Sequence, residues 1–199
     1  ELDALVVQGA QGTQGTQGTQ GTQGTQGGLP KNRITELYGK KGIGKTTLMS
    51  HILPRVVGKI LYIDAENAIS RVLPENVVVV RAFILEHIQG IVNDALQSKA
   101  FDVIVVDSIA ATTTQQELDA DEGMAQMGLK AKVMSQWMRT INKYLFNSGT
   151  AVVMINQERD TLNAFGIKSF TPGGKALPYA ATLRIELTSW SKDKIIKDK

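Results

Sequence analysis

Apolar residues are gathered in short runs along most of the chain, and the spacing within these runs is of two kinds. Six runs are continuous and rich in β-branched residues, which is typical of buried strands. They are Ile34 to Tyr38, Lys59 to Ile63, Val77 to Val80, Phe101 to Val106, Thr150 to Ile155 and Ala181 to Leu187. Three stretches have helical spacing: Lys45 to Val56, Glu86 to Ser98 and Met127 to Phe146. Strands that alternate with helices favour a mostly parallel, twisted sheet with helices on both faces, so we expect an α/β fold.

The beginning of the chain follows a different pattern, because a Gln-Gly-Thr tripeptide repeats between Gln8 and Gly27. Glycine at every third position is also the collagen pattern, but this tract has no proline to favour the extended helix. These residues bury too little apolar surface to offset the entropy of ordering, which favours a flexible insertion. We therefore expect a lead-in over residues 1–7, a flexible insertion over 8–27 and one folded domain over 28–199.

Composition narrows the class of protein. No apolar stretch approaches the roughly 20 residues that a membrane span needs, and no basic segment followed by a long apolar one marks a secretory signal at the start. The absence of cysteine excludes disulfides and thiolate metal sites, and it fits a reducing cytosol. The net charge of +3 permits a nucleic-acid partner without arguing for one. We expect a soluble, cytoplasmic protein.

A glycine-rich motif lies between the first predicted strand and the first predicted helix. The segment Gly39 to Thr46 reads GKKGIGKT and satisfies the pattern G-x-x-x-x-G-K-[ST], in the strand-to-helix context that it requires. Glycines let backbone amides point at phosphate oxygens, and the helix adds its positive end. Lys45 is expected to neutralise the β- and γ-phosphates of ATP, and the Thr46 hydroxyl to bind Mg²⁺.

Carboxylates follow two of the other predicted strands. Asp107 comes directly after FDVIVV, where a P-loop protein needs an acidic residue to hold the metal's water shell. Asp64 and Glu66 lie just past the second strand, and either is a candidate to orient or deprotonate an attacking water; their spacing does not choose between them. The predicted nucleotide-binding residues are Gly39, Lys40, Lys41, Gly42, Ile43, Gly44, Lys45, Thr46, Thr47 and Asp107, with Thr46 and Asp107 as the metal site.

Several segments resemble, in the same order, the core of bacterial RecA recombinases. They are GGLPKNRITELYGKKGIGKTTL, YIDAEN, FDVIVVDSIAA, MGLKAKVMSQWMR, VVMINQ and GGKALPYAATLR. Many ATPases share the P-loop, whereas MGL followed by MSQ-x-MR, and INQ followed by GG-x-AL, are far more specific. The short segment between Asn67 and Phe101 is similar to that of bacteriophage relatives. The resemblance covers nearly everything after the repeat, and it implies a RecA-like P-loop NTPase core over residues 28–199.

The resemblance also implies catalytic roles. It matches the catalytic glutamate of the family's DAE motif to Glu66, and the glutamine that senses the γ-phosphate to Gln157. A terminal strand of the family supplies two lysines to the ATP of the neighbouring subunit, and these match Lys197 and Lys199. The predicted catalytic residues are therefore Lys45, Glu66, Gln157, Lys197 and Lys199.

The family's two DNA loops match Gln115 to Gln126 and Glu158 to Lys175, which are polar, glycine-bearing and without regular apolar periodicity. Mobile loops are therefore expected there. The resemblance implies apolar insertion by one residue and backbone contacts by the others. The predicted DNA-binding residues are Met127, Lys132 and Arg139 beside the first loop, and Arg159, Phe165, Lys168, Gly173, Gly174 and Lys175 in the second.

The sequence also departs from the family pattern. Where the family has an amino-terminal helix, this sequence reads ELDALVVQGA, and the comparison with the family leads us to expect neither that helix nor the carboxy-terminal domain that gathers duplex DNA. Pro178 replaces a lysine, and Ser70 replaces an aspartate that helps to read adenine.

The function that the resemblance implies is an ATP-dependent recombinase for recombination and repair. It would bind single-stranded and homologous duplex DNA and assemble into a filament or ring. The alternatives are a RecA-core ATPase of the helicase or repair-accessory type, and a non-catalytic DNA-binding module that holds nucleotide as a structural ligand.

Overall fold

Six parallel strands form the central sheet, and they correspond to the six apolar runs of the sequence. They are β1 (Arg33–Gly39), β2 (Ile60–Asp64), β3 (Val77–Arg81), β4 (Val103–Asp107), β5 (Ala151–Gln157) and β8 (Leu183–Leu187). Their order across the sheet is β3-β2-β4-β5-β1-β8. Strands β2 and β4 are buried throughout, whereas the edge strands β3 and β8 have no fully buried residue. The computed structural model describes residues 28–69, 73–120, 128–163 and 166–189, and for 160–163 and 166–170 it describes only the backbone.

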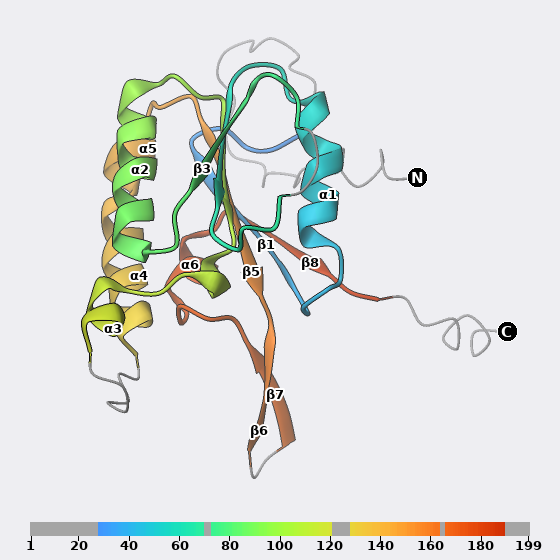
Figure 1. Ribbon diagram of the computed structural model, residues 1–199, viewed down its shortest axis with the longest axis vertical. Helices are drawn as coiled ribbons and strands as arrows, with labels where there is room; N and C mark the ends of the chain where they lie inside the picture. Colours follow the sequence, from blue (N-terminus) through green and yellow to red (C-terminus); the bar gives the residue numbers. More distant parts are fainter. Residues whose placement is uncertain (1–27, 70–72, 121–127, 164–165, 190–199) are drawn as a thin grey trace, which may run out of the picture. The chain divides into compact units, whose positions relative to one another are not determined.

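Helices cover both faces of this sheet, which confirms the α/β prediction. The main helices are α1 (Lys45–Ile52), α2 (Leu85–Ser98), α4 (Leu129–Thr140) and the short α5 (Asn142–Leu145). Figure 1 shows α1 on one face, and α2, α4 and α5 on the other. Apolar side chains three or four positions apart on α2, such as Leu85, Ile88 and Val92, are buried against the sheet together with Trp137 of α4. Each large side chain buried in this way contributes roughly 1.5–3 kcal/mol.

The register of the strands aligns their carboxyl ends at one edge of the sheet. Asp64 of β2 lies opposite Asp107 of β4, and Gly39 of β1 lies opposite Gln157 of β5. Side chains that follow these strands therefore meet at this edge, which is where α/β proteins of this kind bind ligands.

The predicted helix Lys45 to Val56 was too long. The α-helix ends at Ile52 and continues as a 3₁₀ turn, η2 (Leu53–Arg55), because Pro54 has no backbone N–H to continue the helical hydrogen bonds and its ring crowds the carbonyl four residues earlier.

The predicted helix Met127 to Phe146 is two helices rather than one. α4 begins after Gly128, whose φ of 91° ends any helix before it, and α4 and α5 are separated at Ile141. Met127 lies outside the described residues.

Both segments predicted to be mobile loops contain regular structure, so that part of the prediction was wrong. The first begins with the helix α3 (Gln115–Asp119), which the 3₁₀ turn η3 (Ile109–Ala111) precedes. In the second, β6 (Arg159–Asn163) and β7 (Gly166–Phe170) form an antiparallel hairpin, and the helix α6 (Ala176–Ala180) follows. The elements α3, β6, β7 and α6 have only five residues each, which is too short for apolar periodicity to stand out.

Among the residues that the structure describes, no helix is both long and apolar enough to cross a lipid bilayer. The Gln-Gly-Thr tract lies outside those residues, so its interpretation as a flexible insertion stays a prediction.

Candidate functional site

The glycine-rich motif joins β1 to α1 in the strand-to-helix context that the sequence predicts. Gly44 caps α1 with a φ of 103°, a left-handed backbone conformation that favours glycine. The first turn of α1 contains no acidic residue, so no carboxylate opposes its positive end. A loop of this kind, followed by the amino end of a helix, suits a bound phosphate.

Lys45 is the buried cation of this loop. The residue is 7% exposed, and its ammonium group donates to the carbonyl oxygens of Gly39 at 3.0 Å and Lys40 at 2.8 Å. Burial lowers the pKa of Lys45, and the negative charges of Glu66 and Asp107 partly oppose that change. A desolvated cation whose partners here are carbonyl oxygens gains a strong interaction when an anionic phosphate arrives.

Asp107 lies beside Lys45 at the end of β4 and is 3% exposed. Its Oδ2 accepts hydrogen bonds from the Thr46 hydroxyl at 2.7 Å and the Tyr62 hydroxyl at 2.6 Å. Burial raises the pKa of Asp107, and these two hydrogen bonds act in the opposite direction. Sequence reasoning missed Tyr62, although a hydroxyl inside the apolar run KILYI signals that a polar partner must lie nearby.

The hydroxyl of Thr46 and the carboxylate of Asp107 fit Mg²⁺. This ion keeps several waters and takes one or two carboxylates together with substrate phosphates. A site made from protein carboxylates alone would need more acidic groups, and the part of the chain that the structure describes contains no cluster of three or more potential ligands from His, Cys, Asp and Glu. The donors present therefore suit a metal that arrives with a nucleotide.

The structure distinguishes Asp64 from Glu66, which their spacing in the sequence could not do. Asp64 is buried, and its two oxygens accept from the backbone amides of Ala68 at 3.1 Å and Ile69 at 3.2 Å. It therefore stabilises the turn after β2. Glu66 instead accepts hydrogen bonds through Oε1 from the Ser108 hydroxyl and the Gln157 side chain, each at 2.5 Å.

A cavity of about 270 Å³ brings most of the predicted nucleotide-binding residues together with Glu66 and Gln157. Its lining consists of Lys41, Gly42, Gly44, Lys45, Thr46, Thr47, Glu66, Asp107 and Gln157. Of the other predicted residues, Gly39 and Lys40 present their carbonyls to Lys45, and Ile43 is half-buried within the loop. A second cavity of about 300 Å³ shares Thr46 and Thr47 with the first and includes the apolar side chains of Leu53, Ile69 and Leu73.

The residues predicted to bind DNA divide into three groups. Lys132, Arg139, Arg159, Gly174 and Lys175 are exposed. Gly173 is buried, and its nearest neighbours are Met134 and Ile109. Lys168 lies in β7 with only its backbone described, and Met127 and Phe165 lie outside the described residues. Lys197 and Lys199, which were predicted to be catalytic, also lie outside them.

Sequence reasoning also missed Lys130, at the start of α4. Its ammonium group is partly buried and donates to the carbonyl of Ala110 at 3.4 Å. Burial lowers the pKa of Lys130, the negative charge of Glu117 raises it, and the positive charge of Arg159 lowers it further. Two cations therefore lie near each other where the hairpin begins. The sequence prediction named the neighbouring Lys132 instead, because Lys132 matches a family motif.

The comparisons with known proteins agree with this fold. The family model described as the RecA N-terminal domain matches residues 10–199. "Protein RecA" of Aquifex aeolicus strain VF5 is 38% identical over 171 residues, which cover 80% of this chain and 50% of that protein. The proteins of the same name from Aquifex pyrophilus and Thermosynechococcus vestitus are each 37% identical, over 80% of this chain and 49% and 48% of theirs. The chain spans about half the length of these relatives, and it belongs to the RecA family.

Proposed function

We propose that this chain is the ATP-hydrolysing core of a DNA recombinase that acts in recombination and repair. The observation that carries the proposal is the convergence of Lys45, Asp107, Glu66 and Gln157 on one cavity at the carboxyl edge of the sheet. In addition, 80% of the chain aligns with a relative named "Protein RecA". The nucleotide is ATP with Mg²⁺, and the second cavity, which shares two threonines with the first, is proposed to receive the sugar or base.

Each side chain has a proposed task in hydrolysis. The loop amides and Lys45 bind the phosphates, and Thr46 and Asp107 hold Mg²⁺, which when bound neutralises charge on the phosphate oxygens. Glu66 orients the attacking water and accepts its proton, a role that suits a carboxylate at the cavity wall. Gln157 contacts Glu66 and lines the same cavity, so its amide is within reach of a terminal phosphate.

The proposed DNA partner lies along the hairpin and α4. Glu158 alone separates Gln157 from β6, and the exposed cations Lys132, Arg139 and Arg159 suit phosphate contacts. Lys130 is added to this group because of its position near Arg159. Met127, Phe165, Lys168, Gly173, Gly174 and Lys175 remain part of the proposed DNA surface. The trans role of Lys197 and Lys199, the filament or ring, duplex DNA as a second substrate, the domain boundaries and the cytoplasmic location also stay predictions.

ATP turnover by the full chain, measured with and without single-stranded DNA, tests this function. We expect DNA to stimulate turnover, and Glu66→Gln to lower it about 100-fold or more while Mg²⁺-ATP still binds. A chain that binds Mg²⁺-ATP but is indifferent to Glu66→Gln would be a non-catalytic module, contrary to the proposal.

Electron microscopy separates the recombinase from a helicase or repair-accessory ATPase. With single-stranded DNA and a non-hydrolysable ATP analogue, a recombinase is expected to coat the DNA as regular helical filaments. Isolated particles that do not coat the DNA would favour the accessory ATPase instead.

A further inference from the structure

A buried amide lies between the nucleotide cavity and the hairpin. Asn156 is 0% exposed and is the residue before Gln157 in β5. Its Oδ1 accepts from the backbone N–H of Gln157 at 3.0 Å, and its Nδ2 donates to the carbonyl oxygen of Pro172 at 3.2 Å. Gln157 precedes the hairpin and Pro172 follows it, so one side chain contacts both ends of the segment that contains β6 and β7. Figure 1 shows that β6 and β7 extend away from the central sheet.

Glu36 determines which way this amide points. Glu36 is 0% exposed in β1, and its Oε1 accepts a hydrogen bond from Asn156 Nδ2 at 3.3 Å. An ionised carboxylate only accepts hydrogen bonds, so it requires the NH₂ group of Asn156 on its side and leaves the amide oxygen for Gln157. The orientation of Asn156 therefore follows from the chemistry of its partner.

Glu36 is held in turn by the edge strand of the sheet. Arg184 of β8 donates through Nε to Glu36 Oε2 at 2.7 Å, and its guanidinium group lies 4.5 Å from the centre of the Tyr38 ring. A buried carboxylate costs several kcal/mol unless it is paired. Pairing with Arg184 and Asn156 meets that requirement, and it connects β8, β1 and β5 in a single network.

The two ends that Asn156 contacts differ in their surroundings. On one side, the Gln157 side chain donates to Glu66 and lines the cavity. On the other side, Pro172 leads into Gly173, which is buried against Met134 of α4 and Ile109 of η3. A displacement at the cavity that moves Gln157 would therefore act, through Asn156, on a segment end that is packed against the core.

We propose that Asn156, oriented by Glu36, is a positioning residue that couples nucleotide binding to the DNA affinity of the hairpin. The inference rests on the proposed function, in which the hairpin segment binds single-stranded DNA and Gln157 responds to the terminal phosphate. Asn156 transmits that response, because the same amide bonds the backbone of Gln157 and the carbonyl at the far end of the segment. Without it, the cavity and the hairpin bind their ligands independently.

The test measures coupling rather than activity. The affinity of the full chain for a fluorescent oligo-dT strand is measured with and without a non-hydrolysable ATP analogue and Mg²⁺. The coupling ratio is the DNA affinity with the ATP analogue divided by the DNA affinity without it. Allosteric coupling commonly amounts to about 5- to 150-fold, and we expect the wild-type ratio to lie in that range. Asn156→Ala is expected to bring the ratio to within about threefold of one, while the affinity for the ATP analogue without DNA changes less than about threefold.

Two further variants provide a control and a second, independent test. Asn76→Ala is the matched control: it removes another amide that donates to backbone carbonyls, those of Gly58 at 2.6 Å and Val56 at 3.4 Å, at the opposite edge of the sheet. It should leave the ratio unchanged even where it lowers stability. Glu36→Gln preserves shape but provides one acceptor oxygen in place of two, so it should reduce the ratio in the same direction as Asn156→Ala, and it serves if that variant does not fold.

The outcomes separate the inference from the proposed function. If wild-type DNA affinity does not depend on nucleotide, the proposed function fails and the coupling with it. If the wild type shows the dependence and both Asn156→Ala and Glu36→Gln retain it, the proposed function stands and the role of Asn156 is overturned. If the role of Asn156 is purely structural, the variants should lose nucleotide affinity, DNA affinity and unfolding temperature together. The ratio of DNA affinities with and without the ATP analogue would then stay at its wild-type value.

Discussion

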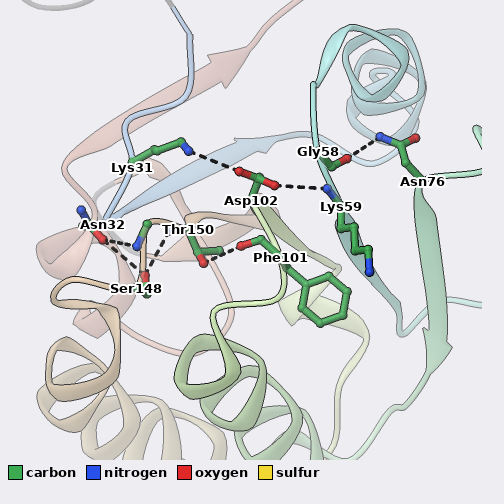
Figure 2. Close-up of polar contacts among 10 residues, drawn as sticks. Lys31, Asn32, Gly58, Lys59, Asn76, Phe101, Asp102, Ser148 and Thr150 are labelled. Atoms are coloured by element: carbon green, nitrogen blue, oxygen red, sulfur yellow. Dashed lines mark hydrogen bonds and ion pairs between the residues drawn. The ribbon is translucent and has the colours of Figure 1, made fainter.

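The two edges of the sheet carry different kinds of polar contact. Figure 2 shows the amino edge, where the strands begin. The contacts there end mostly on the backbone: Asp102 accepts from the amide of Lys59 at 3.2 Å, and Thr150 donates to the carbonyl of Phe101 at 2.7 Å. Asp102 also accepts from the exposed side chain of Lys31 at 3.3 Å. These contacts close turns and hold strand ends in register.

At the carboxyl edge, by contrast, the two carboxylates of the cavity, Asp107 and Glu66, bond to other side chains. Asp107 accepts from two hydroxyls, and Glu66 accepts from Ser108 and Gln157. Such contacts hold ionisable groups in place without committing backbone groups, so the groups can exchange partners when a ligand arrives. One edge therefore stabilises the sheet, and the other provides chemistry at some cost in stability.

The largest effect is expected from removing the buried cation of the carboxyl edge. Lys45→Ala should weaken ATP binding about 100-fold, because a hydrogen bond to a charged group contributes up to about 3 kcal/mol. Titration with a fluorescent ATP analogue measures the change. Lys31→Ala makes the same substitution at the amino edge, where the lysine is 61% exposed and pairs with Asp102, and should leave ATP affinity unchanged. Equal losses in the two variants would contradict the division between the edges.

A change at the amino edge should affect stability without affecting binding. Gly58 has a φ of +106°, and a Cβ there would collide with the Asp102 carboxylate. Gly58→Ala is therefore expected to lower the free energy of unfolding by about 2 kcal/mol, measured by urea denaturation, with ATP affinity preserved in the folded protein.

Gly90→Ala is the matched control for that substitution. Gly90 lies within the helix α2, and nothing lies within 4 Å of a Cβ placed there. This variant should raise the free energy of unfolding by about 0.5–1 kcal/mol. A loss of stability at position 90 similar to that at position 58 would show that steric conflict with Asp102 is not the cause.

The carboxyl edge should become more stable when its buried charge is removed. Because burial raises the pKa of Asp107 above the ordinary value of 3.8, the folded protein binds this proton more tightly than the unfolded chain does. The ionised form therefore costs stability at neutral pH, and the cost disappears as the pH falls toward 3.8. With chelator present, Asp107→Asn is expected to raise the free energy of unfolding at pH 7.5 by an amount on the order of 1 kcal/mol.

Thermal unfolding of Asp107→Asn and the wild type across pH checks this sign. The advantage of the variant should shrink steadily toward acid pH, because the wild-type carboxyl then gains its own proton. If the stability difference between the variant and the wild type is constant with pH, or if the variant is the less stable at pH 7.5, the ionised Asp107 carboxylate does not destabilise the fold.

The backbone of this edge could largely be predicted from the sequence. All six strands lie within two residues of the predicted runs, because buried β-branched runs leave few alternatives in an α/β chain. The errors occurred where local chemistry overrides periodicity, as at Pro54, or where elements are too short to show a pattern, as in the hairpin β6–β7.

The partners of the site residues were harder to predict. Spacing could not separate Asp64 from Glu66, because the difference lies in two backbone amides that fold onto Asp64. Tyr62 meets Asp107, and Asn156 meets Glu36, only once parallel strands are set side by side in register. Register is a property of the folded sheet, so neither pair is visible along the chain.

The smallest expected effect tests whether backbone-directed contacts stabilise a carboxylate outside the nucleotide cavity, in a helix cap. Glu117 of α3 accepts from the amide of Thr114 at 2.8 Å and the hydroxyl of Thr113 at 3.0 Å, and Thr114 caps the helix in return. Burial favours the neutral acid, but these hydrogen bonds outweigh it and lower the pKa of Glu117 below its ordinary 4.5. The ionised form therefore stabilises the fold above pH 4.5, and that contribution is lost as the pH falls through the lowered pKa.

Glu117→Gln should therefore lower the free energy of unfolding at pH 7 by roughly 0.5–1 kcal/mol, the usual contribution of a helix cap. The difference from the wild type should narrow below pH 4, where the wild-type carboxyl is protonated, so its pH dependence is opposite in sign to that of Asp107→Asn. Urea denaturation at pH 7 and at acid pH measures both. Parallel pH profiles for the two variants would mean that both carboxylates respond to the net charge of the protein, and the distinction between backbone-directed and side-chain-directed contacts would then explain neither.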